Sequence, residues 1–362
     1  MSPITENTPS LRDFQNDLPL HPAARDLLEY FFDSGWADPS KLHHQSAQLR
    51  NLVGSARETI AANLGIAVSE LEVVGELGFG FQTALGGLLK DPSRRFIYSE
   101  IDRQVIHAFA RAHSHAGGVV AELKPRESGI VNFQSALEDS DSCVISWQAT
   151  NREMGVIQEP PKIDENQSLF GDMTASFPLN RLPDKWDSAL WDPRSFGGPQ
   201  GIALVGISDH SKWRNPGPEI DNRRVFGSFS KPLLLATAVA LENWMKTSED
   251  DFRRLRALNT FTRELLISLV NGVHVVGDEK NCDPRFLAFV LPHSVAEEVL
   301  RKVELDGFLI DAGSACGAGA LSPSHVLTAL GFSERGNLRI TLKPHHDENT
   351  VKELVERIAA SA

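Results

Sequence analysis

The sequence predicts an α/β fold, with a large domain built on a mainly parallel sheet and a second, smaller α+β domain. Short apolar runs alternate with helical patterns over much of the chain, which is typical of strand–helix units in a parallel sheet. Beyond about residue 246 this alternation gives way to a different order of strands and helices. The chain has 362 residues, of which 41% are hydrophobic, enough to bury one large core or two modest ones.

The first part of the chain begins with an amphipathic helix predicted over residues 46–64. Its apolar residues recur every three or four positions, and Gly65 follows as a typical C-terminal stop. Short apolar runs then predict strands at 73–74, 96–98, 119–120, 143–147, 169–170 and 202–207. Helical patterns follow at 232–246 and 250–270. We therefore expect the large domain to span residues 40–246.

The last part of the chain alternates strands and helices in a shorter pattern. Strands are predicted at 286–291, 307–311 and 338–342, and helices at 294–303, after Pro323 and from Asp347. These elements predict a small domain over residues 247–362, joined by an N-terminal segment of residues 1–39. No repeat or low-complexity linker marks the boundary, so its position depends on the change of pattern alone.

Charge and cysteine content exclude several classes of function. The net charge is −12 and no basic block offsets it, which argues against nucleic acid or an anionic membrane as a partner. The polar N-terminus lacks the pattern of a signal peptide, and no run of 18 apolar residues occurs. The three cysteines have no CxxC spacing, which fits a reducing compartment better than disulfides or zinc. We expect a cytoplasmic protein without a metal centre.

Two stretches of the large domain carry candidate binding groups. Gly75-Glu-Leu-Gly78-Phe-Gly80 forms a glycine-rich turn between a strand and a helix, where free N–H groups would favour a phosphate. Its spacing matches neither the dinucleotide fingerprint nor the P-loop, so a simple tight turn remains an alternative. Asp172 ends a predicted strand, where its carboxylate would face the crevice of a parallel sheet or cap the strand end.

The small domain contains three further candidates. Cys316 lies in a flexible Gly/Ala loop, GSACGAG, where a thiol is either a reachable nucleophile or inert. Arg339 lies within an apolar strand, so it is expected to face a carboxylate, from a ligand or from a neighbouring side chain. His345 and His346 are adjacent and have no third ligand nearby in the sequence, which indicates a solvated loop instead of a metal site.

Together these stretches resemble the fold-type I enzymes that use pyridoxal phosphate (PLP), in particular the class V aminotransferase and cysteine desulfurase family. Residues 313–332, GSACGAGALSPSHVLTALGF, are similar to the desulfurase loop that carries the persulfide-forming cysteine. Residues 147–158, WQATNREMGVIQ, match the family's Ala-Asn-x-Glu-x-Gly-x-x-Gln stretch. Residues 38–61 and 227–242 resemble its early Asn-Pro-Ser-Ser-Leu-His segment and its Gly-Thr-Pro-x-x-Pro segment. The resemblance covers nearly the whole chain and implies the PLP-dependent transferase (aspartate aminotransferase-like) fold.

The resemblance also shows which catalytic residue is missing. The family reads Ser-x-His-Lys-Phe-Gly-Gly-Pro-Lys-Gly where this chain reads DPRSFGGPQG, so Asp192, Arg194 and Ser195 stand at the Ser, His and Lys positions. In the family that lysine forms an imine with PLP and then moves the substrate's α-proton. A serine hydroxyl does neither. Losing a positioned proton-transfer group alone lowers a rate by roughly 10²- to 10⁴-fold, so we expect no ordinary desulfurase turnover.

Other cofactor positions differ as well. The family's ring-stacking histidine aligns with Ile101, its phosphate-binding threonine falls near Gly80, and its glutamine beside the ring oxygen is Ala175. The resemblance still implies cofactor contacts at Asp172, Asn151, Ser228, Gly80 and Arg194, a persulfide nucleophile at Cys316 and a substrate-carboxylate contact at Arg339. Lys185, Lys212 and Lys231 lie in neighbouring segments and are expected to be solvated instead of replacing the missing amine.

Three hypotheses of function remain open at this point. The first is a cysteine desulfurase-like pseudoenzyme that binds, accepts sulfur from a transfer partner or regulates an active relative. The second is an enzyme that uses PLP non-covalently, and the third is a sensor of a carboxylated or phosphorylated small molecule. The resemblance implies a homodimer. It also implies PLP as a cofactor, although covalent binding is not expected and no cofactor is an alternative.

Overall fold

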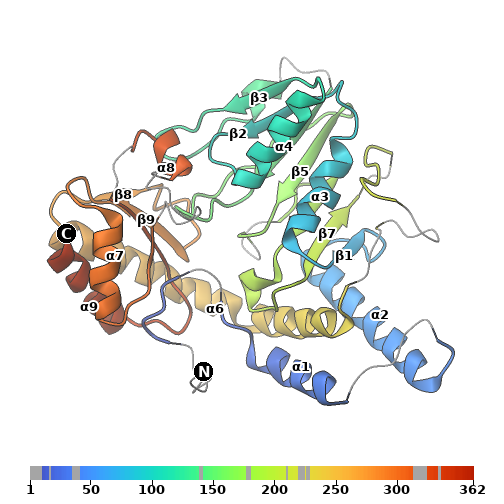
Figure 1. The fold of residues 1–362 in the computed structure, drawn as a ribbon, viewed down its shortest axis with the longest axis horizontal. Helices are drawn as coiled ribbons and strands as arrows, with labels where there is room; N and C mark the ends of the chain where they lie inside the picture. Colours follow the sequence, from blue (N-terminus) through green and yellow to red (C-terminus); the bar gives the residue numbers. More distant parts are fainter. Residues whose placement is uncertain are drawn as a thin grey trace.

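The computed structural model describes residues 10–15, 18–34, 41–137, 142–176, 181–208, 211–218, 225, 229–312, 324–332 and 336–362. In these ranges a large and a small sheet lie on either side of a central region, and one long helix, α6 (Lys231–Leu269), runs beneath both (Figure 1). The predicted boundary at residue 246 lies within this helix. Phe14 packs in the core of the small sheet, whereas Ala24 and Leu28 pack in the core of the large one.

The large sheet has seven strands in the order β1-β7-β6-β5-β4-β2-β3. Their bounds are β1 Leu71–Val74, β2 Arg95–Ser99, β3 Val120–Leu123, β4 Cys143–Gln148, β5 Gln167–Asp172, β6 Ser188–Trp191 and β7 Ala203–Ile207. All pairings are parallel except those of β7, which runs antiparallel to β1 and β6. Strands β4 and β5 are buried at every position, as expected for central strands that are covered on both faces.

Helices cover both faces of the large sheet. The helices α3 (Leu77–Leu88) and α4 (Gln104–His115) lie on one face (Figure 1), where Phe81, Ile106 and Phe170 share a core. The other face packs against α2 (His44–Leu64) and the first half of α6, with α1 (Pro22–Ser34) beyond. Short helices α5 (Gln134–Leu137) and η1 (Pro193–Phe196) complete this part.

The small sheet is antiparallel, with strand order β10-β11-β9-β8. Its strands are β8 His274–Val276, β9 Phe286–Val290, β10 Asp311–Ala312 and β11 Asn337–Thr341. The helices α7 (Ala296–Leu305) and α9 (Glu348–Ser361) pack on one face with the second half of α6, and α8 (His325–Ala329) lies near the large sheet (Figure 1). The α+β prediction is therefore confirmed for these residues.

Three sequence predictions in these regions were wrong. The strand predicted at 307–311 is only β10, Asp311–Ala312. The helices predicted at 232–246 and 250–270 are one helix of 39 residues, because the intervening Thr247-Ser248-Glu249 contains neither glycine nor proline to end it. The loop predicted to be solvated at His345 and His346 is partly buried. His346 is only 6% exposed, and the centre of its ring lies 4.0 Å from that of the Phe14 ring, with the two planes tilted by 32°.

Among the helices in the described part, not one combines the length and the apolar run needed to cross a bilayer. The same ranges hold no group of three or more His, Cys, Asp or Glu side chains placed to bind a metal ion.

Candidate functional site

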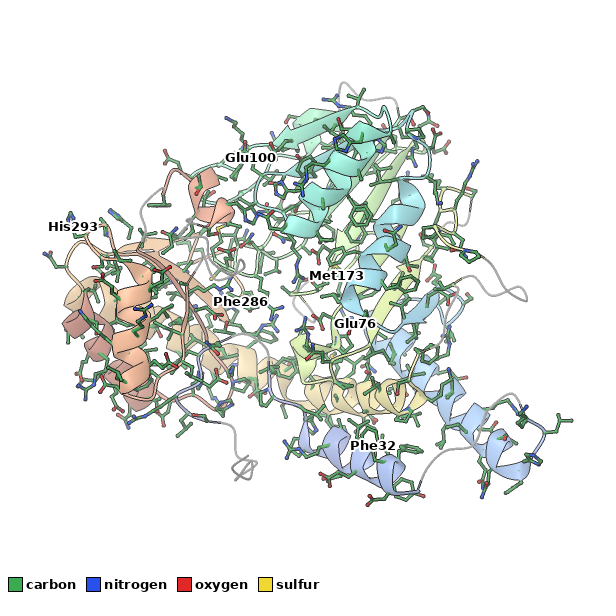
Figure 2. The ribbon with its side chains drawn as sticks, viewed as in Figure 1. Phe32, Glu76, Glu100, Met173, Phe286 and His293 are labelled. Carbon is green, nitrogen blue, oxygen red and sulfur yellow. The ribbon has the colours of Figure 1, made fainter. Side chains whose placement is uncertain are left out.

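A cleft of about 690 Å³ opens between the large and the small sheet, and is called the central cleft below. The carboxyl ends of the parallel strands β2, β4 and β5 meet at this edge, as the geometry of open α/β sheets requires. Its lining comes from the segments after β2 and β4, the first turn of α3, η1, and the small domain: Leu77, Gly78, Phe81, Ile101, Asp102, Arg103, Gln104, Val105, Gln148, Asn151, Arg152, Glu153, Arg194, Asp311, His325, Val326 and Arg339. In Figure 2, Met173 lies on the large-domain side of this region and Phe286 on the small-domain side.

Only one of the two carboxylate oxygens of Asp172 makes hydrogen bonds with the described residues. It is 2% exposed, and its Oδ1 accepts hydrogen bonds from the Thr174 N–H at 3.0 Å and the Thr174 hydroxyl at 2.6 Å. Its Oδ2 is buried and has no hydrogen-bond partner among the described residues. One oxygen therefore caps the strand end, as one of the two interpretations of the sequence expected, and the predicted contact of Asp172 with a cofactor stays a prediction.

Ser195 lies in the short helix η1, which the sequence builds from Asp192 and Pro193. The Asp192 carboxylate accepts from Arg194 N–H as an N-cap, Pro193 presets the first helical residue, and Gly197 closes the turn at φ +73°. The Ser195 hydroxyl donates to the Asp192 carbonyl at 2.8 Å, and the residue is 8% exposed. Ser195 thus completes a turn.

Arg285 fills the space beside Ser195, and sequence reasoning missed it. Its Nη1 donates to the Ser195 carbonyl at 2.9 Å and its Nη2 to the Ala175 carbonyl at 2.5 Å. Asp283 balances its charge through an ion pair of 2.6 Å, in which both side chains are at most 3% exposed. The remaining cavity here is about 20 Å³, lined by Ser195, Arg285 and Arg152 among others, which holds about one water molecule.

Four arginines line the central cleft. Arg194 pairs with Asp192 at 2.6 Å, and Arg103 donates to the Thr174 hydroxyl at 2.5 Å. Arg339 lies 3.7 Å from Glu153 and 3.5 Å from Asp311, both longer than an ordinary hydrogen bond. The carboxylate partner that the sequence predicted for Arg339 is therefore present within the chain, held loosely.

Burial affects the fourth arginine, Arg152, most strongly. The surroundings desolvate its guanidinium and lower its pKa to about 10, although Asp192 nearby acts in the opposite direction. Its position next to Arg194 and Arg339 adds cationic charge that lowers the pKa further. Arginine still stays protonated at neutral pH, so this part of the cleft carries clustered positive charge.

Asn151 uses its whole amide within the chain. Its Nδ2 donates to the Ile101 carbonyl at 3.0 Å and to Gln148 Oε1 at 2.9 Å, and its Oδ1 accepts from the N–H groups of Glu153 and Met154. Asn151 therefore ties the segment after β2 to the segment after β4. Its predicted contact with a cofactor ring stays a prediction.

Gly80 lies in the first turn of α3 instead of in a turn before it. A Cβ at Gly80 would come within 2.5 Å of Leu190 Cδ1 and 3.3 Å of Ala203 Cβ, so the glycine allows the helix to pack closely on the sheet. Glu76 is the N-cap residue of this helix and is exposed; Figure 2 labels it at the start of α3. A carboxylate there repels a phosphate that the helix N-terminus would otherwise attract.

The remaining predicted residues fall into two groups. Ser228 and Cys316 lie outside the described residues. Of the lysines, Lys185 is exposed, Lys212 lies 3.4 Å from Asp187, and the Lys231 ammonium sits 3.7 Å from the centre of its neighbouring Phe229 ring. The described lining of the central cleft contains no lysine.

Asp102, which the sequence analysis also missed, lies at the cleft surface three residues after β2. It is 1% exposed, and burial raises its pKa to about 8, with a further contribution from the nearby Asp172 carboxylate. The signal that could have found it is similar to the one that located Asp172, an aspartate at or near the carboxyl end of a parallel strand.

The chain was compared with known proteins, and similar sequences include cysteine desulfurases. No protein-family model matches the chain. A cysteine desulfurase of Dictyoglomus turgidum is 24% identical over 369 residues, covering 96% of this chain and 93% of that relative. A putative cysteine desulfurase, NifS, of Bacillus subtilis is 24% identical, covering 89% of this chain and 86% of the relative.

Solved structures give the same fold. A NifS-like protein superimposes with a TM-score of 0.84 at 19% identity, covering 96% of this chain and 98% of the other. The apo cysteine desulfurase of Thermococcus onnurineus NA1 gives 0.81 at 14% identity, covering 97% and 95%. The chain therefore has the fold of these proteins over nearly its full length.

Proposed function

We propose that this chain, which belongs to the PLP-dependent class V aminotransferase and cysteine desulfurase family, is a desulfurase-like binding protein that no longer carries out chemistry through a lysine imine. It keeps the scaffold and the cleft between the two sheets. The lysine position is Ser195, and the residues that line the cleft favour a small anionic ligand held by non-covalent contacts.

The observation that carries this proposal is that Ser195 is hydrogen-bonded within its own turn and that neighbouring side chains fill the space around it. A serine hydroxyl cannot form an imine with an aldehyde, and this one is bonded to the Asp192 carbonyl. Arg285 and Asp283 occupy the neighbouring space and leave room for about one water molecule. These residues do not fit covalently bound PLP.

The cationic side chains of the cleft support the choice of ligand. The chain as a whole carries a net charge of −12, yet Arg103, Arg152 and Arg339 gather at one cleft. Guanidinium groups bind carboxylates and phosphates through paired hydrogen bonds, and do so more strongly where water is partly excluded. An anion would therefore be attracted to this cleft despite the acidic surface elsewhere.

One observation favours a second candidate, an enzyme that binds PLP without a covalent bond. The unpartnered Oδ2 of Asp172 would suit the ring N–H of such a cofactor. On this alternative PLP binds measurably, and any slow chemistry depends on Cys316. Sulfur acceptance at Cys316 from a transfer protein, and a cytoplasmic location, are parts of the proposal that rest on family resemblance.

A homodimer is proposed on the same resemblance, and one feature of the surface supports it. Tyr30 and Phe32 on α1 are 64% and 67% exposed, and Figure 2 labels Phe32 on this helix. Large exposed apolar side chains are frequent at interaction surfaces.

The test is the intact mass of the protein after incubation with PLP and borohydride. Borohydride reduces an imine between PLP and any lysine to a stable adduct, so an active desulfurase must gain the phosphopyridoxyl mass as a control. We expect the mass of this chain to remain unchanged under the same conditions. A stoichiometric adduct on one lysine, Lys231 for example, would overturn the proposal and restore an enzyme with a relocated imine.

A further inference from the structure

The short helix α8 belongs to the small domain by sequence but packs on the large one. It follows β10 and precedes β11 along the chain. Its Val326 and Leu327 side chains nevertheless belong to the same buried apolar cluster as Ile101, which lies beyond β2. Figure 1 shows α8 apart from α7 and α9 and toward the large sheet. His325 and Val326 line the central cleft, so α8 forms part of its rim.

Two hydrogen bonds join this part of the chain to the large domain. The Ser324 hydroxyl donates to Glu153 Oε2 at 2.6 Å. His325 Nε2 lies 2.8 Å from the carbonyl of Asp102, and because a carbonyl only accepts, this nitrogen carries a proton. Residues 324–330, which connect the two domains in this way, are called the α8 clasp below.

His107 on α4 also contacts the α8 clasp. Its ring meets the ring of His325 edge to face, with centroids 5.3 Å apart and planes at 89°. It meets the Tyr98 ring of β2 in the same manner at 5.2 Å. Its Nδ1 lies 3.4 Å from Glu122 Oε1 on β3, and its Nε2 is buried. His107 therefore contacts α8, β2 and β3 together.

A neutral His107 ring fits this arrangement better than a charged one. A carboxylate only accepts hydrogen bonds, so the neutral ring carries its proton on Nδ1, facing Glu122. A second proton would go to the buried Nε2, where the charge is shielded from water and lies beside His325. Burial first, and then His325, lower the pKa of His107, whereas Glu122 and the nearby backbone of Asp102 and Glu100 act in the opposite direction. The titratable and charged groups that face His107 are Tyr98, Glu100, Asp102, Glu122 and His325.

We propose that the α8 clasp is a pH-dependent connection between the two domains, which stays bound to the large domain while His107 is neutral and is released when His107 takes up a proton. Release uncovers the part of the cleft rim that His325 and Val326 form. The proposal does not depend on which ligand the cleft binds, or on whether that ligand is PLP.

The direction of the pH dependence follows from the two states of His107. With the clasp released, the ring regains water and loses its neighbour His325, so its pKa returns toward the ordinary value of about 6.5. With the clasp bound, the pKa is lower. Binding of the clasp is therefore at full strength above about pH 6.5 and weakens below it, by up to about tenfold per pH unit until the pKa of the bound state is reached.

Amide hydrogen exchange of the full chain, followed by mass spectrometry, measures release of the clasp. Exchange is compared at pH 7.5 and pH 5.5, with labelling times scaled to the intrinsic exchange rate at each pH, in peptides that cover the clasp and, as an internal reference, α3. His107→Phe keeps a ring against Tyr98 and His325 but cannot titrate. His115→Phe, at an exposed histidine of the same helix, is the matched control. Glu122→Gln lowers the pKa of His107 and leaves its ring in place.

We expect the protection of the clasp amides to fall by about three- to tenfold between pH 7.5 and pH 5.5 in the wild type and in His115→Phe, while α3 stays protected. In His107→Phe the protection should not change with pH, and in Glu122→Gln it should fall less than in the wild type. Equal protection at the two pH values in the wild type, a fall of the same size in His107→Phe, or an equal fall in α3 overturns the inference. If His107→Phe does not fold, an undiminished fall in Glu122→Gln overturns it instead.

Discussion

Asp283 and Arg285 form a buried ion pair that fills the space beside Ser195. Arg285 is bonded to Asp283 and to the carbonyls of Ser195 and Ala175, so it joins the small domain to two segments of the large one. Replacing Asp283 with alanine leaves a buried guanidinium without its counter-charge. We expect this change to lower the free energy of unfolding by about 3–5 kcal/mol, measured by urea denaturation.

The companion variant removes both charges, Asp283→Ala together with Arg285→Met, and should recover much of that loss because no buried charge remains unpaired. The control is Asp250→Ala, whose partner Arg253 at 3.1 Å is as exposed as Asp250 itself. Such a surface pair contributes at most about 1 kcal/mol. If Asp283→Ala lowers the free energy of unfolding no more than Asp250→Ala does, the buried pair does not stabilise the contact between the small domain and the segments at Ser195 and Ala175.

At the scale of an element, the packing of α3 on the sheet depends on one missing side chain. A Cβ at Gly80 would lie 2.5 Å from Leu190 Cδ1, inside a core where Leu190 is fully buried. We expect Gly80→Ala to lower the free energy of unfolding by about 1–2 kcal/mol, because overpacking outweighs the better helix propensity of alanine. Thermal or urea unfolding measures it.

The matched change in the same helix is Gly78→Ala, which meets nothing within 4 Å. Here only the propensity acts, so the variant should be more stable than the wild type by about 0.5–1 kcal/mol. A loss of unfolding free energy for Gly80→Ala and a gain for Gly78→Ala would establish that Gly80 allows the helix to pack on the sheet. An equal gain for both variants would contradict this assignment.

Some strands and site residues could be predicted from the sequence, and others could not. Continuous apolar runs located β7 and β9 almost to the residue, because buried strands carry their own signal. The strand β6 was missed, since it has four residues and begins with a buried serine. Motif resemblance located Asp172, Ser195 and Arg339, whereas Asp102, Arg152 and Arg285 were missed. Their roles arise from contacts between segments far apart in the chain, which no local pattern reports.

At the scale of the whole molecule, the N-terminal segment is bound to the small domain through a buried histidine. His346 Nε2 lies 3.1 Å from the Asp13 carbonyl, its Nδ1 accepts from the Lys343 N–H at 3.2 Å, and its ring packs against that of Phe14. Because Nδ1 must accept, the proton resides on Nε2 and the ring is neutral. Burial, followed by the charges of His345 and Lys343, lowers the His346 pKa to about 3.

This depressed pKa makes the folded state sensitive to acid. In the unfolded chain a histidine titrates near pH 6.5, so between about pH 6.5 and pH 3 the unfolded state binds a proton that the folded state does not. The free energy of unfolding should therefore fall by about 2 kcal/mol between pH 6.5 and pH 4.5 through His346 alone. In His346→Gln, which does not titrate, the fall over this range should be smaller by that amount.

Urea denaturation at the two pH values measures the difference, and His293→Gln is the control because His293 is exposed on the far side of the small domain (Figure 2). The glutamine variant has a lower stability at pH 6.5, since it loses the ring contact with Phe14, so only the change between the two pH values is compared. An acid-induced loss in His346→Gln equal to that of the wild type would place the titration on other groups. A smaller loss of unfolding free energy in the variant would establish that His346 contributes to the acid sensitivity of the fold. Because His346 binds the N-terminal segment at Asp13, the joining of both ends of the chain in the small domain would then depend on pH.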